Sequence, residues 1–242
     1  PIASLTKLMS AAVALDLMNP NETITVSSSA LRVIPTKIGV ATGEKLPLKD
    51  LLEAMLMTSA NDAAQAVHDG VNAKYHENIF VRAMNEKAQS LGLTQTHFAN
   101  PQGFDGNNYS SAHDLAILTQ YVLTHYPLID QIVKQDYTFI PATSEHKQYD
   151  LYNWNGLLGV YPGAFGVKIG NTDKAGYTTV VIAKRNDKII LAVLLGSPGI
   201  LERDLWTANL LDDAFISAFN LPPAHITSAD LEAKYATWHY WN

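Results

Sequence analysis

The pattern of apolar residues changes about halfway along the chain, and this change constrains the fold more than any other feature. Up to about residue 130, apolar side chains recur at the spacing of helices, as they do over 5–17. Short runs rich in β-branched and aromatic residues follow, at 137–140, 165–169, 177–183 and 189–195. Asn186-Asp187 separates the last two runs and is typical of a two-residue hairpin turn, which joins antiparallel strands only. The sequence therefore predicts an α+β fold with an antiparallel sheet.

Helix boundaries follow from the same periodicity. It predicts helices over 5–17, 48–57, 63–71, 78–91, 112–124 and about 205–219. Gly92 closes the helix at 78–91, and Ser111 with Asp114 three residues later predicts a capping box. The chain then ends in a tail that contains Trp238 and Trp241.

Length and composition predict a single domain. A chain of 242 residues, of which 47% are hydrophobic, can bury one large core. We expect a domain over 1–220 and a C-terminal tail over 221–242. Within the domain, we expect an inserted helical sub-domain at roughly 20–135 and sheet strands at roughly 137–196.

Charge and residue usage exclude several classes of function. The net charge is −6 and the basic residues are scattered, so we expect no nucleic-acid partner. The chain has no cysteine, which excludes thiol catalysis and cysteine-ligated metals. Its eight histidines show no His-Glu-x-x-His spacing, and we expect neither a metal nor a cofactor.

Ser4 and Lys7 are candidates for nucleophilic catalysis. They lie three residues apart in a predicted helix, which places both side chains on one face. Burial or a nearby positive charge lowers the pKa of a lysine, which can then deprotonate the serine. The pattern alone is weak, because Ser144 and Lys147 have the same spacing in a polar stretch.

Two further motifs add polar groups. Ser59 and Asn61 fall at a predicted junction between two helices. One interpretation is that they cap a helix, as serine and asparagine often do. The other is that the Ser59 hydroxyl relays a proton while the Asn61 amide binds a peptide. Lys-x-Gly occurs three times, but only Lys168 follows a strand pattern. Gly170 lets a substrate backbone approach that strand closely, and Lys168 is either a solvated strand residue or a positive charge for a substrate carboxylate.

The order of these motifs is more specific than any one of them. Ser-x-x-Lys, Ser-x-Asn and Lys-x-Gly-x-Thr follow one another as in serine β-lactamases and penicillin-binding proteins. The surrounding strings resemble low-molecular-mass D-alanyl-D-alanine carboxypeptidases over positions 1 to about 220: Ala3-Ser-Leu-Thr-Lys-Leu-Met9, Gly43-Glu-Lys-Leu46, Ser59-Ala-Asn-Asp-Ala-Ala64, Thr96-His-Phe-Ala-Asn-Pro101, Tyr109-Ser-Ser-Ala-His-Asp-Leu115 and 166–177. The resemblance implies the β-lactamase and transpeptidase-like fold, in which helices flank the sheet.

The resemblance also implies a mechanism. Ser4 would attack the carbonyl between two terminal D-alanines, Lys7 would take its proton, and Ser59 would relay that proton to the leaving amine. Water would then release the acyl group. Asn61 would hold the peptide, and the amides of Ser4 and Asn171 would form the oxyanion hole. The other implied substrate-binding residues are Lys168, Gly170, Thr172 and Arg203.

Two departures from the family pattern stand out. Ile169 occupies the position where the family usually has threonine or serine, and loss of that hydroxyl predicts weaker β-lactam binding or a shifted specificity, but not a dead enzyme. Family members also carry some tens of residues, including strands, before the Ser-x-x-Lys helix, whereas Pro1 comes three residues before Ser4. We expect a fold without those N-terminal strands, with an exposed apolar edge at 189–195. The chain would then be a fragment, a processed chain, or one with an upstream segment outside this sequence.

The main functional hypothesis is a penicillin-sensitive serine carboxypeptidase that takes the terminal D-alanine from peptidoglycan pentapeptides. Its expected partners are peptidoglycan stem peptides, with β-lactams as covalent inhibitors. Its expected location is extracytoplasmic, and any membrane anchor would lie outside this chain. The alternatives are a DD-endopeptidase with the same site and a non-catalytic muropeptide-binding domain. A β-lactamase is disfavoured because the chain has no Glu-x-x-Leu-Asn string.

Overall fold

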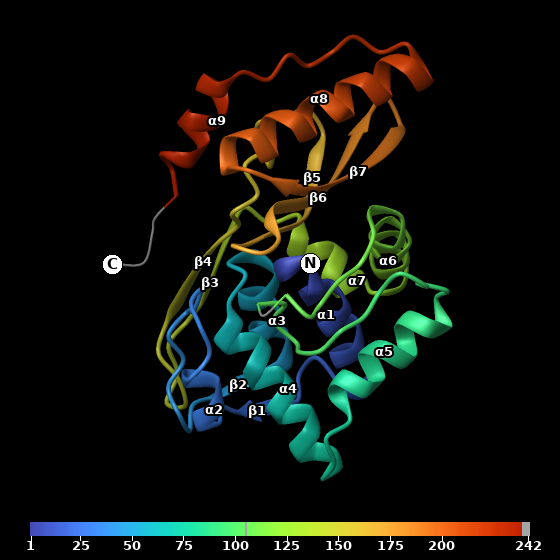
Figure 1. Ribbon diagram of the computed structural model, residues 1–242. Helices are drawn as coiled ribbons and strands as arrows, with labels where there is room; N and C mark the ends of the chain where they lie inside the picture. The colour runs from blue at the N-terminus through green and yellow to red at the C-terminus, as the bar shows by residue number, and fades with distance from the viewer. Residues whose placement is uncertain (105, 239–242) are drawn as a thin grey trace.

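The computed structural model describes residues 1–104 and 106–238, so Trp241 of the expected tail lies outside the described residues (Figure 1). The helices, including the 3-10 turn η1, are η1 (Ala3–Leu5), α1 (Thr6–Leu17), α2 (Ser28–Leu31), α3 (Leu48–Met57), α4 (Asn61–Tyr75), α5 (Phe80–Ser90), α6 (Ala112–His125), α7 (Pro127–Val133), α8 (Ile200–Phe219) and α9 (Ser228–Tyr235). The strands are β1 (Thr23–Thr25), β2 (Lys45–Pro47), β3 (Tyr137–Ile140), β4 (Tyr149–Tyr152), β5 (Ala164–Thr172), β6 (Gly176–Arg185) and β7 (Lys188–Ser197). The α+β class is confirmed.

The main sheet is antiparallel and has the strand order β5-β6-β7. Asn186 and Asp187 join β6 to β7 with φ angles of 47° and 61°, as the hairpin signal predicts. Strand β3 corrects one expectation, because it pairs with β4 in a separate two-stranded ribbon and does not extend this sheet. The sheet strands therefore begin at Ala164 and not at 137.

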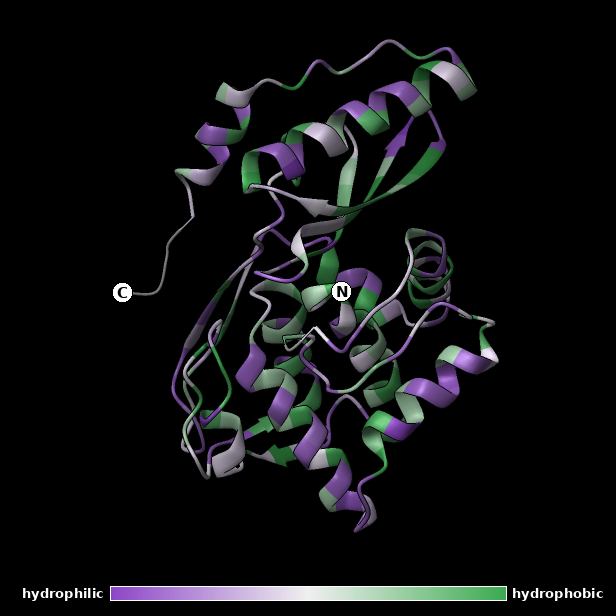
Figure 2. Ribbon diagram, in the orientation of Figure 1, coloured by the Kyte–Doolittle hydropathy of each residue, from purple (hydrophilic) through white to green (hydrophobic). Residues whose placement is uncertain are grey.

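The two faces of the sheet bury different cores. Alternate residues of a strand point to opposite faces, so Val180 and Ile182 join a large core with α1. Val181 and Ala183 face the other way and join a smaller core with helix α8. Figure 1 shows α8 lying across one face of the sheet, and Figure 2 shows that its hydrophobic residues alternate with polar ones. Helices thus flank the sheet, as the resemblance implies.

Helix α1 lies at the centre of the larger core. Every residue from Thr6 to Ala14 is buried, so the helix has no solvent-facing stripe in its first nine positions. A helix enclosed on all sides is held by packing more than by its own amphipathic pattern. This enclosure fixes the direction in which the start of α1 points.

The outer edge of β7 is open in the described part of the chain, where β7 pairs with β6 alone. Helix α6 packs against β7, and Ile189 at the start of the strand is 56% exposed. This edge agrees with the expectation of an exposed apolar strand. No described helix combines the length and hydropathy needed to cross a membrane.

Helix ends differ from the sequence pattern near the C-terminus. Helix α8 begins at Ile200, five residues before the first periodic residue, so Arg203 lies inside it. The expected tail contains a helix of its own, α9, whose Thr227 and Asp230 form a capping box. Leu231 of α9 is buried in the core under α8, which ties this helix to the domain.

Candidate active site

Ser4 lies in the 3-10 turn η1 that runs directly into α1. The sequence placed it in the first turn of a helix, and the structure places it one turn earlier. Lys7 is the second residue of α1 and is fully buried, whereas Ser4 is partly exposed to the cleft. The Nζ atom of Lys7 lies 2.7 Å from the Oγ atom of Ser4. The predicted pair is therefore in hydrogen-bond contact.

Three groups surround the Lys7 amine. Besides Ser4, the Oδ1 atom of Asn61 lies 2.7 Å from Nζ and the main-chain oxygen of Gln102 lies 2.9 Å from it. Both of these oxygens accept hydrogens, so a neutral amine that donates two hydrogens to them directs its lone pair at Ser4. Burial and then the charge of Lys168 hold the pKa of Lys7 well below its usual range, although Asp62 opposes the shift. Lys7 thus meets the geometric and electrostatic requirements of a general base.

Gln102 is a residue that the sequence did not reveal. It acts through its main-chain oxygen, which every residue type carries, so no side-chain pattern can mark it. Asn100 shapes this segment, because its Oδ1 atom accepts from the amides of Gln102 and Gly103 at 3.2 and 2.7 Å. A side chain at Gly103 would lie 1.9 Å from the main-chain oxygen of Ala3, so only glycine lets the segment lie against η1.

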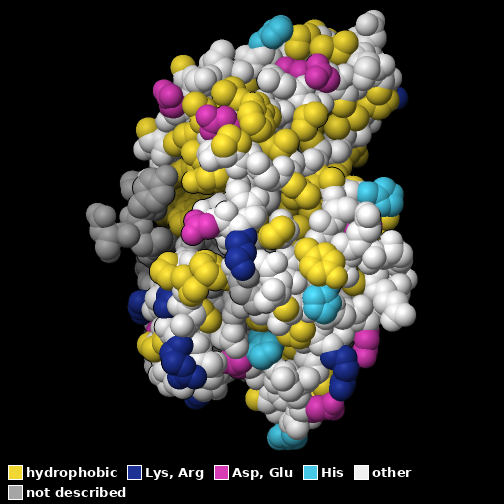
Figure 3. Space-filling view, viewed as in Figure 1, with side chains coloured by type: hydrophobic (Ala, Val, Ile, Leu, Met, Phe, Trp, Pro, Cys, Tyr) yellow, Lys and Arg dark blue, Asp and Glu magenta, His cyan; other side chains and the backbone are white. Residues whose placement is uncertain are grey.

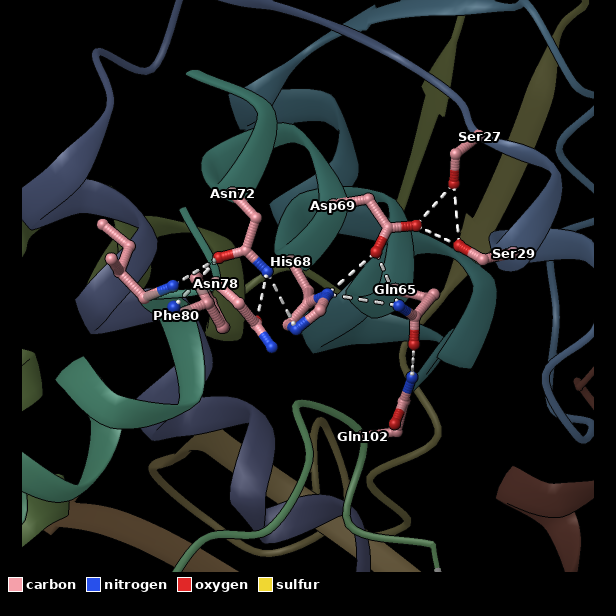
Figure 4. Close-up of polar contacts among 10 residues, drawn as sticks. Ser27, Ser29, Gln65, His68, Asp69, Asn72, Asn78, Phe80 and Gln102 are labelled. Atoms are coloured by element: carbon pink, nitrogen blue, oxygen red, sulfur yellow. Dashed lines mark hydrogen bonds and ion pairs between the residues drawn. The ribbon is translucent and has the colours of Figure 1, made fainter. Parts of the chain in front are cut away.

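A polar network on α4 supports Gln102 from the other side (Figure 4). The side-chain amide of Gln102 donates to Gln65 at 2.5 Å, and Gln65 donates to Asp69 at 2.7 Å. Burial raises the pKa of Asp69, but hydrogen bonds outweigh burial and hold it at about 2. Those hydrogen bonds come from His68, Ser27, Ser29 and Gln65. The ionised carboxylate of Asp69 therefore anchors a chain of contacts that ends at the amine of Lys7.

Ser59 and Asn61 lie at the junction between α3 and α4, as predicted. Ser59 has a φ of 62°, and Asn61 is the first residue of α4. The Nδ2 atom of Asn61 donates to the main-chain oxygen of Ile34 at 2.9 Å, which fixes the amide with its oxygen toward Lys7. No described group hydrogen-bonds to the Oγ atom of Ser59, and this side chain lines the cavity beside Ser4.

Asp62 holds the segment that forms the opposite wall of the cavity. Its carboxylate accepts from the amides of Ile38, Gly39 and Val40 at 3.2, 2.8 and 3.2 Å. The amide of Asn61 also donates to the oxygen of Thr36 at 2.8 Å. Three amides on one buried carboxylate form a strong local anchor. The string Lys37-Ile38-Gly39 follows Pro35 and Thr36, which line the cavity, but none of its own residues lines it.

Strand β5 brings the third motif beside the nucleophile. A side chain at Gly170 would lie 2.7 Å from the amide nitrogen of Ser4, so glycine is required for this close approach. Lys168 is buried, and its Nζ atom donates to the main-chain oxygen of Ile169 at 2.9 Å. Burial and the charge of Arg203 lower the pKa of Lys168 to about 7.

The resulting cavity has a volume of about 180 Å³. Predicted site residues that line it are Ser4, Ser59, Asn61, Asn171 and Thr172. Ile169 also lines it, so an apolar side chain faces the cleft where the family has a hydroxyl. The sequence missed the remaining lining residues, which are Pro35, Thr36, Phe104, Trp154 and Asp173.

Arg203, which the resemblance implies as a substrate-binding residue, lies in the first turn of α8. It is buried, does not line the cavity, and donates to both carboxylate oxygens of Asp204 at 2.7 and 2.8 Å. Its charge still reaches Lys168, whose pKa it lowers. Direct contact between Arg203 and a substrate would require this pair to open.

Figure 3 shows one face of the molecule, with hydrophobic side chains gathered over the sheet and α8 and basic side chains scattered. Among the lining residues of the cavity in the described part of the chain, Asp173 alone carries a charged side chain. Lys7 and Lys168 are both buried and do not line the cavity.

Comparisons with known proteins identify the family of the chain. The family model described as D-alanyl-D-alanine carboxypeptidase matches residues 1–199. The chain is 32% identical over 221 residues to D-alanyl-D-alanine carboxypeptidase DacF of Bacillus subtilis, covering 88% of this chain and 55% of that protein. It is 33% identical over 214 residues to the D-alanyl-D-alanine endopeptidase of Escherichia coli, covering 82% and 64% of the two chains.

The solved structures agree as well. The crystal structure of the D-alanyl-D-alanine carboxypeptidase from Mycobacterium tuberculosis superposes with a TM-score of 0.79 at 30% identity, covering 93% of this chain and 83% of that chain. The chain spans little more than half the length of the Bacillus relative. The family match covers η1, α1, the α3–α4 junction and β5, which carry the site, and the chain belongs to the D-alanyl-D-alanine carboxypeptidase family.

Proposed function

We propose that this chain is a serine DD-peptidase that removes the terminal D-alanine from peptidoglycan pentapeptides through an acyl-Ser4 intermediate. The observation that carries the proposal is the 2.7 Å contact between Lys7 Nζ and Ser4 Oγ, with Asn61 and Gln102 positioned to accept the two hydrogens of the neutral amine. This arrangement activates a hydroxyl that is otherwise a poor nucleophile.

In the proposed acylation, Lys7 takes the proton of Ser4 as Oγ attacks the scissile carbonyl. The amides of Ser4 and Asn171 face the developing oxyanion, and the start of α1 adds its positive helix end. The proton then passes through Ser59 to the departing D-alanine nitrogen. Water attacks the ester, Lys7 again serves as the base, and Ser4 is regenerated.

Release of D-alanine tests the proposal directly. The purified chain is incubated with a pentapeptide that ends in D-alanyl-D-alanine, and free D-alanine is measured over time. We expect release at a rate that rises with enzyme concentration and stops on addition of a penicillin. Peptide binding without any D-alanine release would favour the non-catalytic muropeptide-binding domain.

A DD-endopeptidase is the second candidate, because the E. coli relative with 33% identity carries that name. Both reactions use the same acyl-serine chemistry and differ in the leaving group. Parallel assays with the monomeric pentapeptide and a purified cross-linked dimer separate them. We expect the pentapeptide to react faster, since the cavity beside Ser4 measures only about 180 Å³.

The expected partners follow from this chemistry. Stem peptides of peptidoglycan are the proposed substrates, and β-lactams the proposed covalent inhibitors that acylate Ser4. We place the working location outside the cytoplasm, in the periplasm or on the outer face of the cytoplasmic membrane, because peptidoglycan lies there.

Restoring a hydroxyl at position 169 is expected to strengthen penicillin acylation. Ile169→Thr supplies a donor at the wall of the cavity, and a hydrogen bond to a charged group is worth about 1.5–3 kcal/mol. We expect the second-order rate constant of acylation to rise by about one to two decades. Ile190→Thr is the matched control, because Ile190 packs in the core under α8. An unchanged rate in Ile169→Thr would show that position 169 does not face the β-lactam carboxylate.

The affinity for substrate is expected to weaken above neutral pH. Lys168 has a pKa of about 7, so its amine is charged below that pH and neutral above it. A charged amine attracts the C-terminal carboxylate of the peptide, and the KM should therefore rise by about tenfold per unit above pH 7. Initial rates measured between about pH 6 and 9 give this profile. A peptide with an amidated C-terminus should show a flat KM, and equal slopes for both peptides would contradict the role of Lys168.

A further inference from the structure

The main-chain oxygen that faces Lys7 belongs to Gln102, which lies in a segment without helix or strand between α5 and α6. In a helix or a sheet, regular hydrogen bonds would fix such an oxygen. In this segment, side-chain contacts have to fix it. The oxygen lies 2.9 Å from Nζ of Lys7, so a small shift of the segment would break the contact with the amine.

Asn100 sets the direction of this oxygen. Its Oδ1 atom accepts a hydrogen bond from the amide of Gly103 at 2.7 Å. That amide and the Gln102 oxygen belong to one planar trans peptide group and point in opposite directions. With its N–H held by Asn100, the peptide turns its oxygen toward the lysine amine. Helix α1 also holds the segment, because Ser10 donates to the main-chain oxygen of Pro101 at 2.8 Å.

Contact between this segment and α4 depends on one pair of side chains. The Nε2 atom of Gln102 donates to the Oε1 atom of Gln65 at 2.5 Å. Within residues 1–104 and 106–238, no other hydrogen bond joins α4 to residues 98–104. Both glutamines line a pocket of about 280 Å³ at this place. Close packing therefore does not hold the segment on the α4 side, and the hydrogen bond between the glutamines has that role.

The orientation of the Gln65 amide follows from Asp69 (Figure 4). The ionised carboxylate of Asp69 only accepts hydrogens, and Nε2 of Gln65 donates to its Oδ1 atom at 2.7 Å. The oxygen of the Gln65 amide is thereby left for Gln102. Ser27 and Ser29 donate to the other carboxylate oxygen and hold Asp69 in place. Hydrogen bonds to an ionised group are stronger than those between neutral groups, so Asp69 is a firm anchor for Gln65.

We propose that Gln65 is a positioning residue for the general base of this site. It holds Gln102 so that the main-chain oxygen of Gln102 takes one hydrogen of the neutral Lys7 amine and the lone pair is directed at Ser4. Neither glutamine lines the cavity that contains Ser4, so Gln65 acts on the reactivity of Lys7 and not on the contact with substrate. This inference rests on the proposed function, since it takes Lys7 as the base and Ser4 as the nucleophile.

Gln65→Leu tests the proposal, because leucine has a similar size and cannot accept a hydrogen from Gln102. The rate constant for acylation by benzylpenicillin and the kcat for D-alanine release should both fall by about two- to tenfold, the effect of one lost hydrogen bond. The KM for the pentapeptide should stay unchanged, so kcat/KM should fall by the same factor as kcat. Gln120→Leu is the matched control, since it makes the same substitution at an exposed position of α6 and should leave both rates unchanged.

A double-mutant cycle shows whether Gln65 acts through Gln102. Gln102→Leu removes the side-chain amide but keeps the main-chain oxygen that faces Lys7. Both single substitutions break the same contact, so the double variant should lose no more activity than either single variant. Thermal unfolding shows whether each variant is folded, and Gln102→Leu carries the test if Gln65→Leu does not fold.

An unchanged kcat in the single variants would overturn the role of Gln65 and leave the peptidase reaction standing. A rise in KM at constant kcat, or losses that multiply in the double variant, would overturn it in the same way. An unaltered protein that forms no penicillin adduct and releases no D-alanine would overturn the proposed function as well.

Discussion

Ser4→Ala is expected to abolish covalent labelling by a penicillin and to stop D-alanine release. The substitution removes the oxygen that we propose forms the acyl bond, and loss of a catalytic serine lowers turnover by about 10⁶-fold in a comparable serine peptidase. Intact mass spectrometry after incubation with benzylpenicillin measures the outcome. The unaltered protein should gain the mass of one penicillin, and the Ser4→Ala protein should gain none.

The chain supplies its own control for this experiment. Ser144 and Lys147 repeat the Ser-x-x-Lys spacing in the segment between β3 and β4, but Glu145 and Lys147 there are exposed. The Nζ atom of Lys147 lies 5.3 Å from the ring centre of Tyr149. Ser144→Ala should therefore label like the unaltered protein. An adduct retained in Ser4→Ala would place the nucleophile at another residue.

Lys7→Met is expected to slow acylation by about 10³-fold while the protein stays folded. The change keeps the length of the side chain but removes the base, and general base catalysis contributes about 10²–10⁴-fold. The pH profile separates this role from a structural one. In the unaltered protein the acylation rate should rise with pH as Lys7 loses its proton, because only the neutral amine accepts one. Burial lowers the pKa of Lys7, so this rise should occur well below the usual range for lysine.

The variant should lose that pH dependence along with the rate. Lys147→Met, the equivalent change in the second Ser-x-x-Lys string, should alter neither. Thermal unfolding of both variants shows whether the fold persists after the buried amine is removed. A Lys7→Met protein that acylates at the normal rate with an unchanged pH profile would exclude Lys7 as the base.

Much of the site was predictable because its motifs are local. The spacing of Ser4 and Lys7 brings them together through one turn of backbone, and the structure gives 2.7 Å between their reactive atoms. Ser59 and Asn61 lie between α3 and α4 where the periodicity is interrupted. The β6–β7 turn also followed from two residues, since Asn and Asp tolerate positive φ.

Other parts were beyond prediction because their partners are distant in the sequence. Strand β4 pairs with β3 across a polar loop. The sequence pattern did not predict this four-residue strand. Helix α9 carries Leu231, which is buried in a core shared with α8 and the sheet.

The sequence by itself determined the fold class, the hairpin between β6 and β7 and the identity of the Ser4 and Lys7 pair. Hydrophobic periodicity, turn residues and short motif spacings depend on residues that are close in the sequence, so the sequence alone can predict their effects. Only the tertiary structure decided what suits Lys7 to the proposed role of base, which is full burial, the amide of Asn61 and the main-chain oxygen of Gln102. Those contacts join residues that lie 54 and 95 positions from Lys7 in the chain. Desolvation and hydrogen bonding at such separations exist only once the core has closed around the amine.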